Sequence, residues 1–276
     1  MAKSYTVGTR LLAHYRRTAR DLPWRRTHDP YEVLVSEVML QQTQAGRVAP
    51  AFDRFVRRFP TLEALAGAPL GAVLREWSGL GYNRRARDLH RIARLSPSGL
   101  PRTVAELEAL PGIGAYTAGA IACFAFGQRV AFADTNIRRV LGRFFLGRRA
   151  TETEGVALDA KAMPPRASDL WHHALMDLGA TICKPRAPMC EVCPLKSDCL
   201  FARSPALARE ARPAAHRNTD RRVRGAIVRA LVETETGLTV RALEKRIGDP
   251  RVGRLVKKLT ADGLVESAGR RVRLPS

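Results

Sequence analysis

Apolar residues recur at helical spacing from the N-terminus to about residue 204, and no alternating strand pattern of useful length interrupts them. Short segments rich in proline or glycine, at 59–61, 67–69 and 97–99, separate the apolar stretches. We therefore predict consecutive helices and an all-α fold for this part of the chain. The stretches with the clearest helical spacing are 33–39, 49–59, 70–77 and 89–95, with a shorter turn at 62–65.

A second, smaller unit is predicted after a linker. Between 204 and 220 the periodicity is lost, and Pro, Ala and Arg accumulate. Three helical segments follow, and two short alternating segments then flank the turn Ala268-Gly269-Arg270. Three helices followed by a β-hairpin is the order of a winged helix. The predicted boundaries are a domain at 1–203, a linker at 204–220 and a winged-helix-like domain at 221–276, with helices at 225–232, 239–247 and 252–262 and strands at 264–267 and 271–274.

The charge of the chain predicts a polyanionic partner. The formal net charge is +21 over 276 residues, with a pI of about 11.0. Such an excess favours nucleic acid over a membrane surface, with salt-dependent binding through counterion release. Residues 212–276 contain sixteen Lys or Arg and seven Asp or Glu. A basic winged helix usually contacts DNA, although such modules also dock proteins.

Nothing in the sequence predicts export or membrane insertion. No apolar run approaches 18 residues, and the cationic, helix-like stretch at 1–20 lacks the apolar core of a secretory signal. We therefore expect the protein to stay in a reducing compartment. In that reducing compartment Cys123, alone on an apolar stretch, is expected to be a buried core thiol.

Four of the five cysteines fall in one short segment with the spacing C-x6-C-x2-C-x5-C: Cys183, Cys190, Cys193 and Cys199. Four soft thiolates this close can hold a metal or a cluster. Paired disulfides would suit a small secreted scaffold and not this chain. Structural zinc usually has two close C-x2-4-C pairs, and here only Cys190 and Cys193 form one. The asymmetry favours a [4Fe–4S] cluster, with zinc as the alternative.

Residues 110–114 (LPGIG) predict a hairpin between helical stretches at 103–110 and 116–126. Gly112 and Gly114 allow a tight turn and expose backbone N–H groups beside a helix N-terminus. Such a site suits a phosphate oxygen, and it positions a DNA backbone without reading its sequence. The Ala- and Gly-rich helix behind the turn permits close packing. This pattern is typical of a helix-hairpin-helix motif.

Two acidic residues are candidates for acid–base chemistry. Glu37 lies within the apolar stretch 33–40, where burial would raise its pKa and keep it protonated, as a general acid requires. Asp134 precedes a helical stretch as a plausible N-cap, which is compatible with facing a ligand. Two carboxyl groups in different environments are what cleavage of a glycosidic bond needs. The sequence alone also allows Glu37 to be a helix carboxylate paired with an arginine.

A chain of ordered motifs resembles the helix-hairpin-helix DNA glycosylases, and most closely their MutY-type adenine glycosylases, which act on adenine opposite 8-oxoguanine or guanine. The resemblance covers residues 8–203. Its motifs are LPWRR, DPYEVLVSEVMLQQTQ, FPTLEALA, WSGLGYNRRARDLH, LPGIGAYTAGAI, ADTNIRRV, MDLGATIC and the four cysteines.

The resemblance implies a two-lobed, mainly α-helical fold with a [4Fe–4S] cluster on the four cysteines, and a double-stranded DNA substrate from which a mispaired adenine is flipped. It implies that Glu37 protonates adenine at N7 and that Asp134 stabilises the oxocarbenium ion. Asn136 matches the polar partner in the same motif, and Tyr116 falls at the hairpin position that carries a tyrosine or serine in this family.

Further residues are assigned by the resemblance to DNA contact. Gln42 and Tyr82 match residues that wedge into the base stack. The hairpin glycines Gly112 and Gly114, and the cations Lys184 and Arg186 of the cysteine loop, are expected to grip phosphates.

The chain differs from the family at several positions, and these differences leave alternative functions open. A lysine stands at position 116 in the endonuclease III branch, where it attacks the sugar, so Tyr116 predicts a monofunctional glycosylase. The winged-helix-like unit replaces the usual Nudix-like domain. Asn83 stands where many relatives have tyrosine, and Thr135 where MutY-type chains commonly have glycine. A thymine or uracil mismatch glycosylase is therefore the alternative within the superfamily, and a non-catalytic DNA-damage-binding Fe–S protein the alternative outside it.

Overall fold

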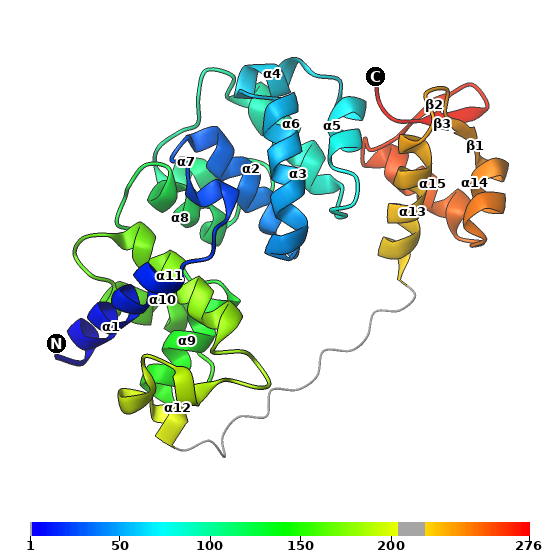
Figure 1. Cartoon of the computed structure of the whole chain (residues 1–276). Helices are drawn as coiled ribbons and strands as arrows, with labels where there is room; N and C mark the ends of the chain where they lie inside the picture. Colours follow the sequence, from blue (N-terminus) through cyan, green and yellow to red (C-terminus); the bar gives the residue numbers. More distant parts are fainter. Residues whose placement is uncertain (1, 204–218) are drawn as a thin grey trace. The chain divides into compact units, whose positions relative to one another are not determined.

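The computed structural model describes residues 2–203 and 219–276, and it is mainly helical, as predicted (Figure 1). The predicted linker at 204–220 falls almost entirely on 204–218, outside the described residues. The helices up to residue 203 are α1 (Ala2–Thr18), α2 (Pro30–Leu40), α3 (Ala45–Arg58), α4 (Leu62–Gly67), α5 (Leu70–Glu76), α6 (Arg84–Leu95), α7 (Val104–Glu108), α8 (Ala115–Phe124), α9 (Thr135–Leu146), α10 (Glu152–Ala162), α11 (Ser168–Thr181) and α12 (Leu200–Arg203).

Capping explains where the helices begin. Helix α2 starts at Pro30, three residues before the predicted stretch, because the Asp29 carboxylate accepts from the backbone N–H of Tyr31 (2.8 Å) and Glu32 (3.0 Å). Proline at the first helical position has no N–H to leave unpaired. Helix α10 begins with a capping box in which Thr151 and Glu154 bind each other's backbone N–H groups.

By packing, the described residues divide into two units. Of these, the first contains residues 2–28, 102–108 and 113–203, and the second contains residues 29–101, 109–112 and 219–276. In the first unit α9 packs against α10, α11 and α12, and α1 packs against α10 and α11. The fully buried side chains of Leu11, Ile137, Leu141 and Trp171 form its core.

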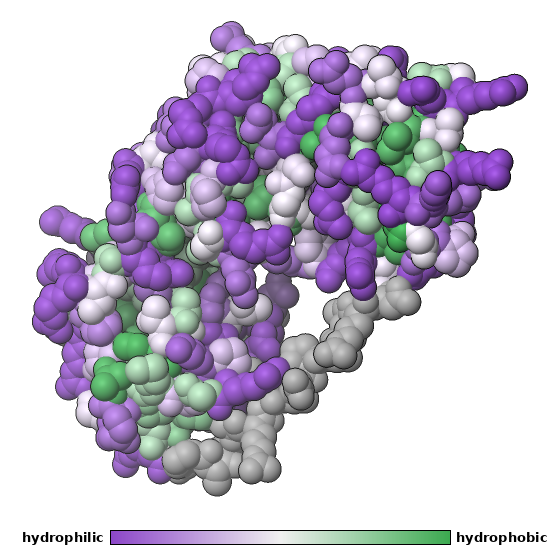
Figure 2. Space-filling view, turned by 45° about the vertical axis from the view of Figure 1, so that its right-hand side comes forward, coloured by the Kyte–Doolittle hydropathy of each residue, from purple (hydrophilic) through white to green (hydrophobic). Residues whose placement is uncertain are grey.

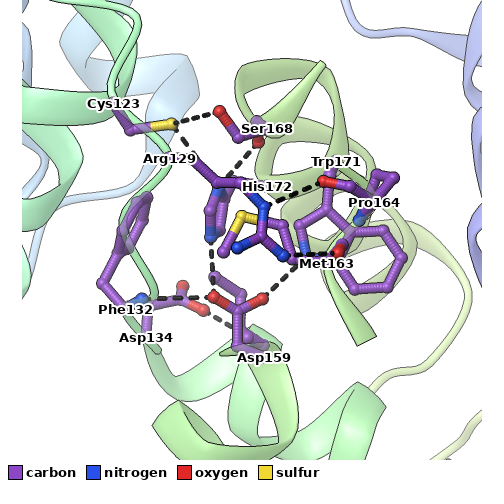
Figure 3. A network of polar contacts seen from close by, with 11 residues as sticks. Cys123, Arg129, Phe132, Asp134, Asp159, Met163, Pro164, Ser168, Trp171 and His172 are labelled. Atoms are coloured by element: carbon purple, nitrogen blue, oxygen red, sulfur yellow. Dashed lines mark hydrogen bonds and ion pairs between the residues drawn. The ribbon is translucent and has the colours of Figure 1, made fainter. Parts of the chain in front are cut away.

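The first unit also has a buried polar network (Figure 3). Asp159, which is fully buried, accepts from Trp171 Nε1 (2.7 Å), pairs with His172 Nε2 (2.8 Å) and accepts from the backbone N–H of Phe132 (3.2 Å). The predicted core thiol Cys123 is confirmed as buried, and it lies 3.6 Å from His172 Nδ1. Because Phe132 comes two residues before Asp134, this network fixes the segment that leads to a candidate catalytic carboxylate.

In the second unit α4 and α5 pack on α6, and α2 packs on α3 and α6. Phe55 lies edge-on to Phe59 and to Trp77, with ring centroids 5.1 and 6.0 Å apart. Helix α2 has apolar residues on all sides, and eight of its eleven residues are buried. A helix of that kind belongs in the middle of a core, which is where α2 lies.

The C-terminal residues contain three helices and a small antiparallel sheet, in the predicted order apart from one additional strand. The sheet order is β1-β3-β2, and Val272 pairs with Leu238 on one side and Ser267 on the other. The first strand was not predicted because two residues show no period. The elements are α13 (Asp220–Val232), β1 (Leu238–Thr239), α14 (Val240–Ile247), α15 (Val252–Ala261), β2 (Glu266–Ala268) and β3 (Arg271–Arg273).

Hydrophilic residues cover most of the face seen in Figure 2, and apolar residues appear there in scattered patches. This distribution fits a chain with a net charge of +21. Within the described residues, no helix is both long and apolar enough to span a membrane.

Removing the Asp159 carboxylate is expected to destabilise the protein strongly. Asp159→Ala leaves the buried His172 and Trp171 N–H groups without their acceptor, which costs about 3–5 kcal/mol. The exposed Glu108→Ala is the matched control and should change the free energy of unfolding by less than about 0.5 kcal/mol. Urea denaturation measures both, and equal effects of the two variants would contradict the assigned role.

His173 makes the first unit sensitive to acid. Its ring stacks on Phe124 with centroids 4.3 Å apart, and burial, aided by Arg25, lowers its pKa to about 3. The unfolded chain takes up a proton near pH 6.5, whereas the folded chain does not. Stability is therefore full above that pH and is lost as the pH falls toward 3.

His173→Phe keeps the stacked ring and removes this titration. Between pH 6 and pH 4 the stability of the wild type should fall relative to that of the variant by up to about 1.4 kcal/mol per pH unit. Urea denaturation at a series of pH values measures the difference. Parallel curves for the two proteins would show that His173 does not titrate in this way.

Candidate active site

Glu37 is buried in the middle of α2, with 6% of its surface exposed. Its neighbours Val33, Leu34 and Val38 are all buried apolar residues. The expectation that Glu37 lies among apolar side chains is therefore confirmed. A carboxyl group in such surroundings is suited to a role that requires the neutral acid.

Asp134 is the N-cap of α9, as predicted. Its Oδ1 accepts from the backbone N–H groups of Asn136 (2.8 Å) and Ile137 (2.7 Å). Its Oδ2 accepts from the side-chain amide of Asn136 at 2.7 Å. These donors hold the Asp134 carboxylate in a fixed orientation at the N-terminus of α9. Asp134 is half-buried, so the cap does not enclose it completely.

A chain of hydrogen bonds leads from Asp134 to the cysteine loop. Asn136, which donates to Asp134, accepts from Arg139 Nη2 at 2.7 Å. Arg139 also donates to the carbonyl groups of Gly179 (2.8 Å) and Cys183 (2.7 Å). A side chain at position 179 would collide with Asn136, because a Cβ there would lie 2.6 Å from the Asn136 Cβ. Gly179 thus permits the close approach that this chain requires.

Tyr116 packs against Phe132, two residues before Asp134. Its ring lies edge-on to Phe132 with centroids 5.5 Å apart, and Phe132 in turn stacks on His172 at 3.9 Å. Gly119, one turn further along α8, allows Phe132 to approach, since a Cβ there would lie 3.0 Å from the Phe132 side chain. The first unit therefore brings the predicted residues Tyr116, Asp134 and Asn136 to one region, and it holds them with packed neighbours.

The hairpin turn precedes α8. Gly112 has a φ of +75°, which a side chain would strain, whereas Gly114 has an ordinary φ of −105° and is the N-cap of α8. Both glycines are exposed, and nothing lies within 4 Å of a Cβ built on Gly114. The backbone around Gly114 is therefore accessible to a ligand at the N-terminus of α8, as the prediction requires.

Gln42 and Tyr82 have unusual backbone conformations, with φ of +56° and +49°. Left-handed geometry costs a residue with a side chain about 1–2 kcal/mol, and such strain concentrates at functional sites. The buried Arg85 holds both segments in place. It donates to the carbonyl groups of Met39 (2.8 Å) and Gln41 (2.6 Å) before Gln42, and to that of Gly81 (3.1 Å) before Tyr82.

Burial lowers the pKa of the Arg85 guanidinium to about 10, so it remains charged at neutral pH. Its guanidinium also lies over the rings of Trp77 and Tyr82, 5.4 and 5.2 Å from their centroids. Arg85 therefore orients the ring of Tyr82, and it also fixes the backbone that leads to this residue.

The four cysteines predicted to bind a metal line one cavity: Cys183, Cys190, Cys193 and Cys199. Its other walls are largely apolar, with Val140, Phe144, Leu178 and Phe201 among them. Within the described ranges, no three Cys, His, Asp or Glu side chains are spaced to hold a single metal ion. Four cysteines that line one cavity are consistent with an iron–sulfur cluster.

The four thiols are half-buried, and one of them lies beside a buried arginine. Burial raises the pKa of Cys193 to about 11 and also raises the pKa values of Cys190 and Cys199. Bound iron would deprotonate these thiols, and binding it would offset the cost of burying charged thiolates. Arg143, which is buried, donates to Cys183 Sγ at 3.5 Å and to the carbonyl groups of Lys184 and Pro185 at 2.7 Å. The donor set therefore fits a cluster.

The side chains of Lys184 and Arg186 are exposed, as predicted for residues that contact phosphates. The sequence did not single out Arg85, Arg139 or Arg143. Each lies at a position where helical spacing calls for an apolar residue, and that is the signal that could have identified them. Glu37, Gln42 and Tyr82 belong to the second unit and Asp134 to the first, so the pairing of Glu37 with Asp134 stays a prediction.

Comparisons with known proteins identify the family. The model of the HhH-GPD superfamily base excision DNA repair proteins matches residues 35–165. An adenine DNA glycosylase of Mycolicibacterium smegmatis is 42% identical over 268 residues, which cover 93% of this chain and 91% of the relative.

Solved structures agree with this assignment. A thermostable thymine-DNA glycosylase superposes with a TM-score of 0.66 at 30% identity, over 73% of this chain and 97% of that one. Endonuclease III in a non-covalent complex with DNA shares the fold, with a TM-score of 0.63 at 23% identity over 74% and 98% of the two chains. The chain therefore belongs to the adenine DNA glycosylases of the HhH-GPD superfamily of base excision DNA repair proteins.

Proposed function

We propose that the protein hydrolyses the N-glycosidic bond of adenine mispaired with 8-oxoguanine or guanine in double-stranded DNA. The observation that carries this proposal is the buried carboxyl group of Glu37, in a chain 42% identical to an adenine DNA glycosylase. A purine leaves readily only when its ring is protonated, and a buried acid can supply the proton. Removal of a pyrimidine has no need of a proton donor to N7.

The two carboxyl groups divide the chemistry between them. Glu37 donates a proton to N7 of the flipped adenine, and the bond between N9 and the sugar then breaks. Positive charge develops on the sugar, and the Asp134 carboxylate stabilises that charge. Asn136 keeps the Asp134 carboxylate oriented through the hydrogen bond at 2.7 Å. Water adds to the sugar and completes the hydrolysis.

Tyr116 makes the proposed enzyme monofunctional. Strand cleavage through a Schiff base needs an amine at the hairpin position, and the phenol of Tyr116 cannot form one. The product is an abasic site in an intact strand.

We propose a [4Fe–4S] cluster on Cys183, Cys190, Cys193 and Cys199, with zinc as the less favoured occupant. The cluster would cross-link the cysteine loop and would take no part in the hydrolysis. The hydrogen bond from Arg139 to the Cys183 carbonyl ties the loop to the residues that orient Asp134. The exposed Lys184 and Arg186 of the loop would contact phosphates of the bound DNA.

The hairpin at Gly112 and Gly114 would hold a phosphate, and Gln42 and Tyr82 would fill the gap left by the flipped base. The protein would act as a monomer, with a glycosylase domain at 1–203, a linker at 204–220 and a winged-helix-like domain at 221–276. Its location would be the bacterial cytoplasm, at the nucleoid.

A thymine or uracil mismatch glycosylase is the second candidate. The specific observation in its favour is the 30% identity to a thymine-DNA glycosylase over nearly all of that chain. The buried Glu37 favours adenine over this alternative. The presence of both Glu37 and Asp134 disfavours a DNA-damage-binding protein without catalytic activity.

Glu37→Gln is expected to lower the rate of adenine release at least about 100-fold, because it removes the proton donor and preserves the shape of the side chain. Single-turnover release from a duplex with adenine opposite 8-oxoguanine measures the rate. Glu32→Gln, in the first turn of the same helix, is the matched control and should act like the wild type. The mechanism is wrong if Glu37→Gln, folded and DNA-bound, remains as fast as the wild type.

A further inference from the structure

A groove of about 730 Å³ lies within the second unit, outside the residues assigned to the chemical step. Its walls come from stretches that are far apart in the sequence: 42–47, 79–85, the part of α13 at 221–229, and Leu259 with Leu264. Seven arginines line it, and none of its described lining residues is acidic. We call it the arginine groove, and its arginines are Arg47, Arg84, Arg85, Arg221, Arg222, Arg224 and Arg229.

The arginines of the groove have two different tasks. Arg84 and Arg224 pair with Asp262, and Arg85 binds backbone carbonyl groups, so these three hold the structure together. The side chains of the other four are exposed: Arg47, Arg221, Arg222 and Arg229. Like charges gathered in a hollow raise the local potential and attract a polyanion.

The C-terminal residues are attached firmly enough to form one wall of the groove. Asp262, at the end of α15, accepts from Arg84 at 2.7 Å, and its carbonyl group accepts from Arg87 at 2.7 Å. The backbone N–H of Gly71 donates to the carbonyl of Pro275 at 2.9 Å. Any side chain at position 71 would collide with that carbonyl group, because a Cβ there would lie 2.4 Å from it.

The groove also contains the two residues with left-handed backbone, Gln42 and Tyr82. Arg221, from α13, hydrogen-bonds the Tyr82 hydroxyl, and its guanidinium lies 4.8 Å from the centroid of the Tyr82 ring. Arg85 contacts the same ring at 5.2 Å. The C-terminal residues therefore reach the loop that the proposed function places in the base stack.

We infer that the arginine groove binds the phosphodiester backbone of duplex DNA beside the mispair. Arg221, Arg222 and Arg229 of α13 then serve as phosphate contacts, and Arg221 also positions Tyr82. Guanidinium groups match phosphate geometry better than ammonium groups do, and the groove is lined by arginine without lysine. The inference rests on the proposed function, because it takes Gln42 and Tyr82 as DNA contacts.

The inference assigns the C-terminal residues to DNA binding instead of to docking another protein. The alternative partner would be an acidic protein segment. It is less favoured because such a segment would have no need of Tyr82 and Gln42 in the wall of the groove.

The salt dependence of DNA affinity tests the inference. In the double variant Arg222→Gln/Arg229→Gln, affinity for a plain duplex and for a mispaired duplex should both fall about tenfold or more at 0.1 M salt. The slope of log Kd against log salt concentration should decrease by about two, one for each lost phosphate contact. The matched control is Lys245→Gln/Lys257→Gln, which removes two exposed charges of the same C-terminal residues outside the groove and should leave affinity and slope near wild-type values.

A second pair of variants leaves α13 untouched. Arg47→Gln, at the other wall, should lower the slope by about one, whereas Arg54→Gln, on the same helix α3 and outside the groove, should not. Equal affinities and slopes for groove and control variants would overturn the inference and favour a protein partner. Adenine release by the wild type on the same duplexes tests the proposed function separately, so the two failures are distinguishable.

Discussion

The carbonyl groups at the C-terminal ends of two helices need partners, and buried arginines provide them. Arg85 binds the carbonyl groups of Val38, Met39 and Gln41 at the end of α2. Arg139 binds those of Gly179 and Cys183 at the end of α11. A cation suits this end of a helix, and the planar guanidinium has enough donors to bind several carbonyl groups at once.

Each of these two arginines also fixes the chain that leaves its helix. After α2 the chain carries Gln42, and after α11 it carries the cysteine loop. Arg139 further reaches Asn136, which orients Asp134. A buried guanidinium without its hydrogen-bond acceptors would destabilise the folded protein. Loss of one contact is therefore expected to disrupt all the contacts around that arginine. The candidate catalytic carboxylate and the cysteine loop therefore depend on the same side chain.

Much of the fold could be predicted from local patterns. Helical spacing and Pro- or Gly-rich breaks placed the helices, and apolar neighbours around Glu37 predicted its burial. Asp134 could be predicted as a helix N-cap because it stands directly before a helical stretch. The resemblance supplied the family, which the comparisons confirm.

What could not be predicted depends on tertiary contacts. An arginine usually suggests an exposed position, so the only local sign that Arg85 and Arg139 are buried is their place on the apolar side of the helical spacing. Strand β1 has only two residues and therefore no period. The arginine groove joins Tyr82 to Arg221, which are 139 positions apart in the sequence. Propensity and spacing contain no information about such a pairing.

Base release by the wild-type protein tests the central claim most directly. Single-turnover assays would use one labelled duplex series: adenine opposite 8-oxoguanine, adenine opposite guanine, thymine opposite guanine and uracil opposite guanine. The account predicts fast release from the two adenine duplexes, with strand breakage only after alkali. Release of thymine or uracil alone would contradict it, and would mean that Glu37 does not serve to protonate a purine.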